Sequence, residues 1–377
     1  MSRVAVNRSI TKQLGELVHV SKGKKHKPSE EGKYRYLNIE DLHNPTNSVF
    51  TEEKGNYVSK SDVLIAWDGA NAGKVGVGFE GMIGSTLAKL EPISEEIHSP
   101  YLFWFLESKN AWIKSQRTGA TIPHVNGASL KSLQIPLPPL ETQKRIAAML
   151  DAADALRRKD RELLDKYDEL AQAIFIDMFG TSKMKAKLAD IATKITDGVH
   201  AKPNYIDSGV PFLSVKNATK RFLDFNDTKF ITQSDHEKFS KRCNPEYEDI
   251  LYTKVGATYG RAAIVDTKME FSIYVSLALI KPDRKKVYPY FLNFVLNTDY
   301  VKMQADRRVK GAGVPDLHLV EIKDFDIPLP SYAEQLKFSN IVEKLNQIKL
   351  TVNNQRMQSN DLFNRLIYNV FNNRISK

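Results

Sequence analysis

The sequence contains very little cysteine: one residue, Cys243, in a chain of 377. A single cysteine excludes a disulfide within the chain and suits a reducing compartment. No apolar run approaches the roughly 20 residues that cross a bilayer, and the opening MSRVAVNRSITKQ lacks the apolar centre of a signal peptide. These absences predict a cytoplasmic protein with no membrane partner.

The sequence also lacks a convincing catalytic or cofactor motif. Gly76–Gly81 spells GxGxxG, but a strand-like stretch follows it where a dinucleotide site needs a helix. The segment with Asp316, Glu321 and Lys323 is similar to a metal-nuclease signature, yet the matching segment at 123–131 carries His124 and a serine instead of the two acidic residues. The histidines show no zinc spacing. We therefore expect no catalytic residues, no metal and no cofactor in this chain.

The charge is strongly unbalanced, with a formal net charge of +10 at pH 7 and an isoelectric point of about 9.3. Such an excess of cations favours a polyanionic partner, and nucleic acid is the commonest one.

The main positive feature is an internal repeat. The stretch QIPLPPLETQKRIAAML at 134–150 returns as DIPLPSYAEQLKFSNIV at 326–342. The regions upstream also match: SDVLIAWDGANAGKVGV at 61–77 resembles EDILYTKVGATYGRAAI at 248–264, and TGATIPHV at 118–125 resembles KGAGVPDL at 310–317. Nearly the whole chain is therefore two copies of one unit, and its period is too long for a solenoid.

Each copy ends in a long helical pattern that begins after prolines, which suit the start of a helix. Apolar residues recur at intervals of three and four, which indicates a heptad seam. Each pattern covers about 40 residues, or roughly 60 Å of helix. We interpret the two helices as antiparallel partners in a coiled coil, although packing of each on its own globular part is the simpler alternative. The predicted pairing residues are Ile146, Met149, Leu156, Leu163, Leu170, Phe338, Ile341, Leu345, Ile348 and Leu362.

The globular parts mix the two kinds of periodicity. Runs such as VLIAW and ILYTKV predict strands, while YLFWFLESKNAWIKSQ and YPYFLNFVLNTDYVKMQ predict helices. The predicted class is α+β, with two similar globular domains separated by two long antiparallel helices and related by pseudo-two-fold symmetry. The predicted segments are a first recognition domain at 1–137, a first helical spacer at 138–180, a second recognition domain at 181–329 and a second spacer at 330–377.

Basic, amide and aromatic residues gather in loops at matching places of the two copies. Gly69–Lys74 and Gly256–Arg261 are glycine-spaced basic turns that depart from a phosphate loop and are either tight strand turns or phosphate contacts. The loop SKGKKHKP at 21–28 holds four lysines. The candidate nucleic-acid contacts are Lys22, Lys24, Lys25, Lys27, Asn71, Lys74, Arg117, His124, Lys202, Asn204, Tyr205, Lys254, Tyr259, Arg261, Arg307, Arg308 and Lys310.

Two globular regions that alternate with helices opening on IPLP resemble the specificity subunit of type I restriction–modification enzymes. The motifs that carry the resemblance are Ile135–Pro138 with Gln143, and Ile327–Pro330 with Glu334 and Gln335. The paired glycine-spaced turns are also similar. The resemblance extends over essentially the whole chain.

This resemblance implies a division of labour. Each globular region would read half of a split, asymmetric target in double-stranded DNA, and the helices would space the two readers. Two methyltransferase subunits using S-adenosylmethionine would dock on the helices, and endonuclease and translocase subunits using ATP and Mg would join them. For paired major-groove readers the half-sites lie about 10 base pairs apart, centre to centre.

Three other interpretations stay open. A related restriction system of the type IIB kind, which cuts on both sides of its site, has the same architecture and differs in its partner. A stand-alone metal-dependent nuclease would use Asp316, Glu321 and Lys323. A helical assembly protein with no DNA role would show no salt-sensitive DNA binding.

Overall fold

The chain divides into two compact units, the first built from two separate parts of the sequence and the second from one continuous part. A computed structural model describes residues 10–42, 49–180, 184–311 and 313–372. Unit 1 comprises Met1–Glu162 and Asn353–Lys377, and unit 2 comprises Leu163–Val352. The unit boundaries therefore fall inside the two long helices and not at the ends of the predicted domains. Parts of the predicted segments, at 1–9, 181–183 and 373–377, lie outside the described residues.

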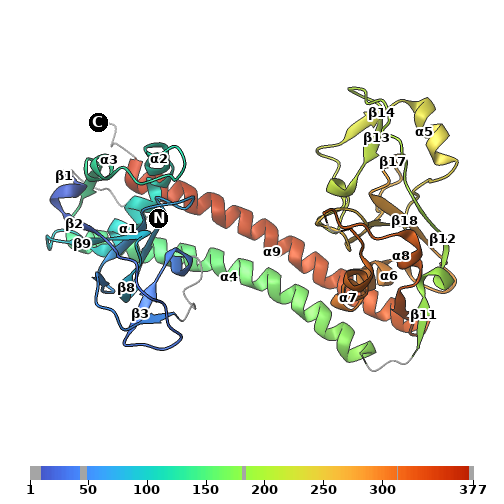
Figure 1. Cartoon of the computed structure of the whole chain (residues 1–377), viewed down its shortest axis with the longest axis horizontal. Coiled ribbons are helices and arrows are strands. Elements are labelled where there is room, and N and C mark those ends of the chain that lie inside the picture. Colours follow the sequence, from blue (N-terminus) through green and yellow to red (C-terminus); the bar gives the residue numbers. More distant parts are fainter. Residues whose placement is uncertain (1–9, 43–48, 181–183, 312, 373–377) are drawn as a thin grey trace. The chain divides into compact units, whose positions relative to one another are not determined.

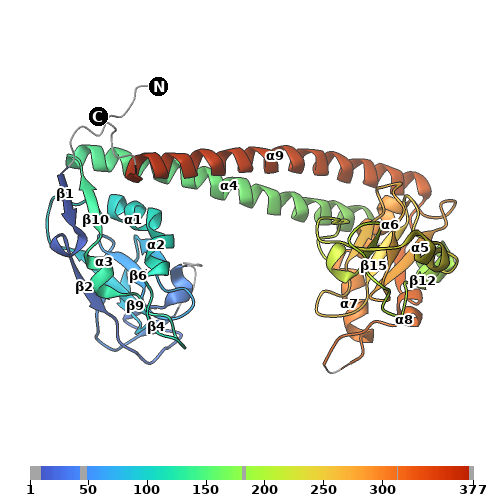
Figure 2. The same cartoon turned by 90° about the horizontal axis from the view of Figure 1, so that it is seen from above.

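Unit 1 contains two four-stranded sheets, a larger one with longer strands, β2-β9-β6-β7, and a smaller one, β4-β3-β8-β5, together with a two-stranded ribbon, β1-β10. In Figure 2 the ribbon strands lie side by side, and β10 leads into the first long helix. The strands of the unit are β1 (Ile10–Gln13), β2 (Val18–Lys22), β3 (Tyr34–Leu37), β4 (Phe50–Thr51), β5 (Tyr57–Val58), β6 (Val63–Ala66), β7 (Val75–Val77), β8 (Gly81–Ile83), β9 (Leu87–Pro92) and β10 (Gln134–Leu137). Its shorter helices are α1 (Ser99–Ser108), α2 (Asn110–Ser115) and α3 (Gly127–Lys131), with 3-10 turns at Leu14–Glu16 and Ile39–Leu42.

Unit 2 repeats this plan with a smaller second sheet. Its sheets have the orders β12-β18-β15-β16 and β14-β13-β17, and its ribbon is β11-β19. Helix α5 lies beside the smaller sheet (Figure 1). The strands are β11 (Lys185–Lys187), β12 (Ala192–Asp197), β13 (Val210–Leu213), β14 (Lys229–Ile231), β15 (Ile250–Thr253), β16 (Ala262–Ile264), β17 (Ser272–Ile273), β18 (Leu277–Pro282) and β19 (Asp326–Pro328). The shorter helices are α5 (Gln233–Ser240), α6 (Pro289–Leu296), α7 (Asp299–Arg308) and α8 (Leu319–Lys323), with 3-10 turns at Leu188–Ile191 and Val215–Asn217.

These elements confirm the α+β prediction. The runs VLIA and ILYT form β6 and β15, the inner strands of the larger sheets, and every residue of both strands is buried. Continuous apolar runs are expected where both faces of a strand are covered. The GxGxxG stretch joins β7 to β8 with no intervening helix, which confirms that it is a strand connection.

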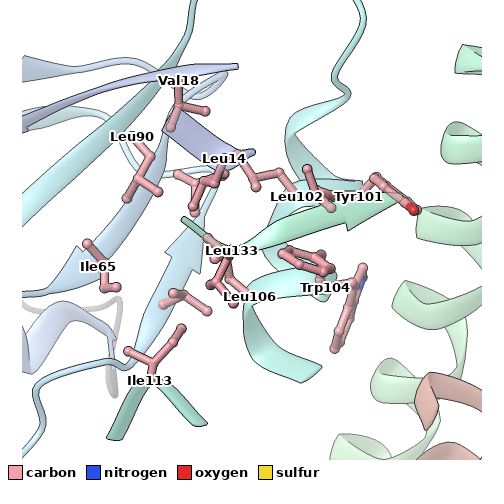
Figure 3. Close-up of a cluster of buried hydrophobic side chains, with 14 of the residues drawn as sticks. Leu14, Val18, Ile65, Leu90, Tyr101, Leu102, Trp104, Leu106, Ile113 and Leu133 are labelled. Atoms are coloured by element: carbon pink, nitrogen blue, oxygen red, sulfur yellow. The ribbon is translucent and has the colours of Figure 1, made fainter. Parts of the chain in front are cut away.

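The core of unit 1 forms where the larger sheet meets α1. Figure 3 shows Leu14, Val18, Ile65 and Leu90 from the sheet side facing Leu102 and Leu106 of α1. Val18 is 2% exposed and the other five are fully buried. The core of unit 2 has the same composition of sheet, 3-10 turn and helix residues around β15 and α6.

The long helices are α4 (Leu140–Phe179) and α9 (Tyr332–Asn372). Each contributes to both units. The start of α4 and the end of α9 share the unit 1 core, where Phe363 and Phe371 lie against Trp104 and Tyr101. The end of α4 and the start of α9 share the unit 2 core. There Phe175 and Phe179 pack against Phe338 with ring centres 5.6 Å apart in both pairs.

The predicted pairing residues divide into two groups. Ile146, Phe338 and Leu345 are buried and Ile341 is partly buried, while the remaining predicted positions are exposed. The exposed ones are Met149, Leu156, Leu163, Leu170, Ile348 and Leu362. The least exposed positions keep a seven-residue period along both helices, as Leu150, Arg157, Leu164 and Ala171 show in α4, and each exposed residue of the list lies one position before such an inward residue. Ala171 and Phe363 are buried beside the exposed Leu170 and Leu362.

The repeated glutamine explains why the proline-led motif occurs twice. The Gln143 side chain accepts from the His98 N–H at 3.0 Å and donates to the Glu96 and Pro138 carbonyls at 2.8 and 2.9 Å. Gln335 accepts from the Tyr288 N–H at 2.8 Å and donates to two carbonyls in the same way. Both glutamines are at most 1% exposed. Each glutamine therefore joins the first turn of a long helix to the loop before a shorter one, which is α1 in unit 1 and α6 in unit 2.

Within the described part of the chain, no helix has both the length and the apolar character that crossing a membrane requires. Cys243 is buried in unit 2, and burial raises the pKa of its thiol to about 12.

We expect Gln335→Leu to lower the free energy of unfolding of unit 2 by about 3 kcal/mol, because three buried backbone groups lose their partner. Urea unfolding followed by labelling of the Cys243 thiol reports this unit, since the thiol is inert until the unit opens. Gln347→Leu, at an exposed position of the same helix, is the matched control and should change stability by less than about 0.5 kcal/mol. Equal stabilities for the two variants would contradict the fastening role.

Candidate nucleic-acid interface

Three loops meet at one edge of the larger sheet in each unit. In unit 1 they are the loop after β2, the turn between β6 and β7, and the segment before α3. The Gly69 N–H donates to the Pro123 carbonyl at 2.9 Å, and Asp68 and His124 form a β-bridge. In unit 2 the Gly256 N–H donates to the Pro315 carbonyl at 2.8 Å. The three basic loops that the sequence separates therefore converge in both units.

The glycine-spaced turns are tight strand turns. Gly69 and Gly73 have φ of +91° and +94°, and Gly256 and Gly260 have φ of +85° and +87°. Other residues rarely adopt this left-handed region, so glycine is required for the turn itself. This confirms the simpler of the two predicted roles.

A second pair of glycines shows that the loops after β2 and β12 are equivalent. A Cβ on Gly23 would lie 2.2 Å from the Gly84 carbonyl oxygen, and one on Gly198 would lie 2.0 Å from the Ile273 oxygen. Only glycine lets either loop cross the smaller sheet so closely. Lys22 and Asp197 directly precede these glycines, so they occupy matching positions with opposite charge.

The unit 1 cluster is centred on Asp68. Its carboxylate lies 2.9 Å from the Lys22 ammonium and 2.6 Å from His124 Nδ1. Burial alone would raise the Asp68 pKa, but the hydrogen bonds with His124 and Lys22 outweigh it and lower that pKa. The carboxylate is therefore ionised at neutral pH and accepts both hydrogen bonds.

A shallow hollow of about 440 Å³ opens beside this cluster. Its wall is the Trp67 indole, with the Lys22 ammonium 5.9 Å from the ring centre. Gly127 leaves the ring uncovered, since a Cβ there would already lie 3.3 Å from the indole. Lys131 supplies a second cation at the rim.

The unit 2 cluster is centred on a buried lysine. The Lys254 side chain is 7% exposed, and its ammonium lies 3.7 Å from Asp197 and 3.5 Å from Asp316. Asp197 also binds Arg242 at 2.6 Å and His200 at 3.2 Å. The Asp316 side chain remains 42% exposed. Burying a charge is costly unless it is paired, and here each buried charge has an opposite partner.

The structure places the predicted contacts in three groups. Lys254 is buried, so its predicted direct contact with nucleic acid is wrong. Others are engaged within their own unit: Arg261 donates to the Thr219 carbonyl, the Tyr259 hydroxyl to Asp306, and Arg308 to Asp324. Lys74 is half-buried, and burial lowers its pKa. Tyr205 packs on Phe212 under Lys229, and Arg117 donates to the Lys114 and Ala70 carbonyls.

The exposed members remain predicted contacts. They are Lys22, Lys24, Lys25, Lys27, Asn71, His124, Lys202, Asn204, Arg307 and Lys310, all exposed or half-exposed. Sequence reasoning missed Trp67, Asp68 and Asp197, which build the clusters. The alignment of the two copies could have revealed Trp67, because it aligns with Lys254, which was among the predicted contacts.

The acidic residues of the nuclease alternative are each held by a lysine. Glu321 lies 2.9 Å from Lys310, and Asp316 lies beside Lys254. Among the described residues, no three histidine, cysteine, aspartate or glutamate side chains are grouped so that they could hold a metal ion.

Comparison with known proteins gives one consistent result. The family model described as "Type I restriction modification DNA specificity domain" matches residues 9–165 and 182–359. The MjaVIII specificity subunit of a type I restriction enzyme from Methanocaldococcus jannaschii is 25% identical over 365 residues, covering 89% of this chain and 85% of that protein. The EcoBI specificity subunit from Escherichia coli is 23% identical, covering 84% and 74%.

Solved structures show the same fold. The S subunit of a type I restriction–modification system from M. genitalium superposes with a TM-score of 0.60 at 17% identity and covers 98% of both chains. A structure described in a study of complex assembly in the type I system has a TM-score of 0.59 at 17% identity, covering 96% of both chains.

Replacing Lys254 with methionine should destabilise unit 2 by about 3 kcal/mol, because it leaves a buried carboxylate without one of its partners. Thermal or urea unfolding measures the effect. Lys216→Met removes an ion pair whose aspartate is 91% exposed, and it should cost less than about 1 kcal/mol. A Lys254→Met protein as stable as Lys216→Met would refute the view that the unit 2 cluster supports this edge.

Proposed function

This chain belongs to the type I restriction–modification DNA specificity family and is a specificity subunit of such a system; from that premise we propose that it reads a split, asymmetric sequence in double-stranded DNA. Each unit reads one half-site through the edge where its three loops converge. Exposed lysines of these loops contact phosphates, which set position and carry no sequence information.

One observation carries this proposal: the same loop edge is built twice with different side chains. Equivalent glycines hold both edges in one backbone shape. The side chains on that shared frame differ, with Lys22, Trp67 and His124 in unit 1 and Asp197, Lys254 and Asp316 in unit 2. A shared frame with divergent side chains is what two readers of unlike half-sites need.

We assign the spacing of the readers to the long helices, paired as an antiparallel coiled coil with pseudo-two-fold symmetry. Contacts within each unit support this. In unit 1 the Arg157 guanidinium lies 4.0 Å from the Phe363 ring centre, and in unit 2 Lys349 binds Asp168. Both pairs join α4 to α9, with rising numbers in one helix meeting falling numbers in the other.

The exposed apolar residues of α4 support docking of two methyltransferase subunits. Met149, Leu156, Leu163 and Leu170 recur at heptad intervals and are 36–53% exposed. An apolar stripe at this spacing suits a partner helix. The methyltransferase would supply S-adenosylmethionine, and endonuclease and translocase subunits would supply the chemistry that uses ATP and Mg. This chain would act without catalytic residues, in the cytoplasm.

The decisive experiment is a methylome. Co-expression with the methyltransferase encoded beside this chain should create methyladenine at a split motif with a fixed spacer, and long-read sequencing detects it. The motif should vanish when this chain is omitted. A confirmed complex that methylates no such motif would refute the proposal. A motif accompanied by cleavage on both sides would assign the chain to the type IIB kind of system.

Removing one heptad from each helix should shorten the spacer and leave both half-sites intact. Deleting 160–166 from α4 and 350–356 from α9 preserves the contacts of Arg157 and Lys349. Seven residues shorten a helix by roughly 10 Å, which corresponds to about three base pairs. The methylome of the variant gives the new spacer directly. Altered half-site sequences would contradict the spacer role.

A further inference from the structure

His124 and Asp316 occupy the same position in the two units. Each closes a short loop through a β-bridge, with Thr118 in unit 1 and Lys310 in unit 2. The residue after each one donates its N–H to the matching turn: Val125 to the Trp67 carbonyl at 2.9 Å and Leu317 to the Lys254 carbonyl at 2.8 Å. The backbone frame is therefore shared, and the side chain is what differs.

Each of these side chains is half-exposed, and each contacts a more buried charged side chain through a hydrogen bond or an ion pair. His124 is 45% exposed and rests on Asp68, which is 19% exposed. Asp316 is 42% exposed and rests on Lys254, which is 7% exposed. Lys254 is in turn held by Asp197 at 3.7 Å. A polar side chain that is held by a more buried partner and remains partly exposed is preorganised to bind a ligand.

The charge of Asp316 decides what that ligand is. The converging loops of unit 2 also carry the exposed cations Lys310, Arg307 and Lys202, which suit phosphates. A carboxylate in the same place is repelled by phosphate and offers only acceptors. The DNA groups that satisfy it are the exocyclic amines in the major groove, N4 of cytosine and N6 of adenine.

We propose that Asp316 is a specificity-determining residue: its carboxylate accepts a hydrogen bond from a cytosine or adenine amine in the half-site read by unit 2. Lys254 is a positioning residue that orients the carboxylate through the ion pair at 3.5 Å. This inference rests on the proposed function. His124, which is 45% exposed and held through Nδ1 by Asp68, makes the corresponding position of the other half-site different.

The test is Asp316→Asn in the complex with the methyltransferase, because asparagine keeps the shape but adds a donor. Asp227→Asn, at the exposed carboxylate paired with Lys216, is the matched control. One base position in the unit 2 half-site should lose discrimination by on the order of tenfold. The other half-site and the spacer should remain those of the wild type.

Two measurements give this result: the methylome, and competition binding with oligonucleotides that each carry one changed base. An unchanged motif in Asp316→Asn overturns the inference, and so does uniform weakening on every oligonucleotide, which a structural role would produce. A wild-type complex that methylates no split motif overturns the proposed function instead. The wild-type arm therefore separates the two failures.

Discussion

The hydrophobic core of each unit depends on aromatic residues from the long helix that begins in the other unit. Unit 1 needs Phe363 and Phe371, which lie near the end of the chain, and unit 2 needs Phe175 and Phe179 from the first helix. Both pairs of rings pack on a short helix: on Trp104 and Tyr101 of α1 in unit 1, and on Phe291 of α6 in unit 2. Aromatic side chains bury more area than any others and dominate such contacts. Burial therefore requires each long helix to contribute to both units.

This requirement has a kinetic consequence. The contacts that complete unit 1 join residues near 104 to residues near 363, and such distant pairs close slowly because loop-closure entropy opposes them. Unit 2 is contiguous in sequence, from Leu163 to Val352. Its own closing contact, Phe175 with Phe338, spans fewer residues, so its loop-closure cost is lower by roughly a few tenths of a kcal/mol.

Burial of apolar area does not explain the buried charges at the loop edges. Replacing a buried ion pair by apolar residues is often neutral or stabilising, so stability alone does not account for Lys254 between Asp197 and Asp316. These ion pairs instead fix the orientation of the exposed Asp316 carboxylate. A half-exposed carboxylate or imidazole that is held from behind loses little conformational entropy when it meets a partner, which sharpens discrimination.

The sequence alone was enough to find the repeat, the α+β class, the starts of the two long helices to within two residues and the family, because these depend on local periodicity, proline position and the shared motifs. It did not determine which helix positions face inward, because some inward positions are polar, such as Arg157 and Lys349, while their exposed neighbours Leu156 and Ile348 are apolar. Only the tertiary structure decided which charged residues meet. Lys22, Asp68 and His124 are far apart in the chain, and their cluster exists because strand register, the close crossing at Gly23 and the turn at Gly69 bring three loops to one edge.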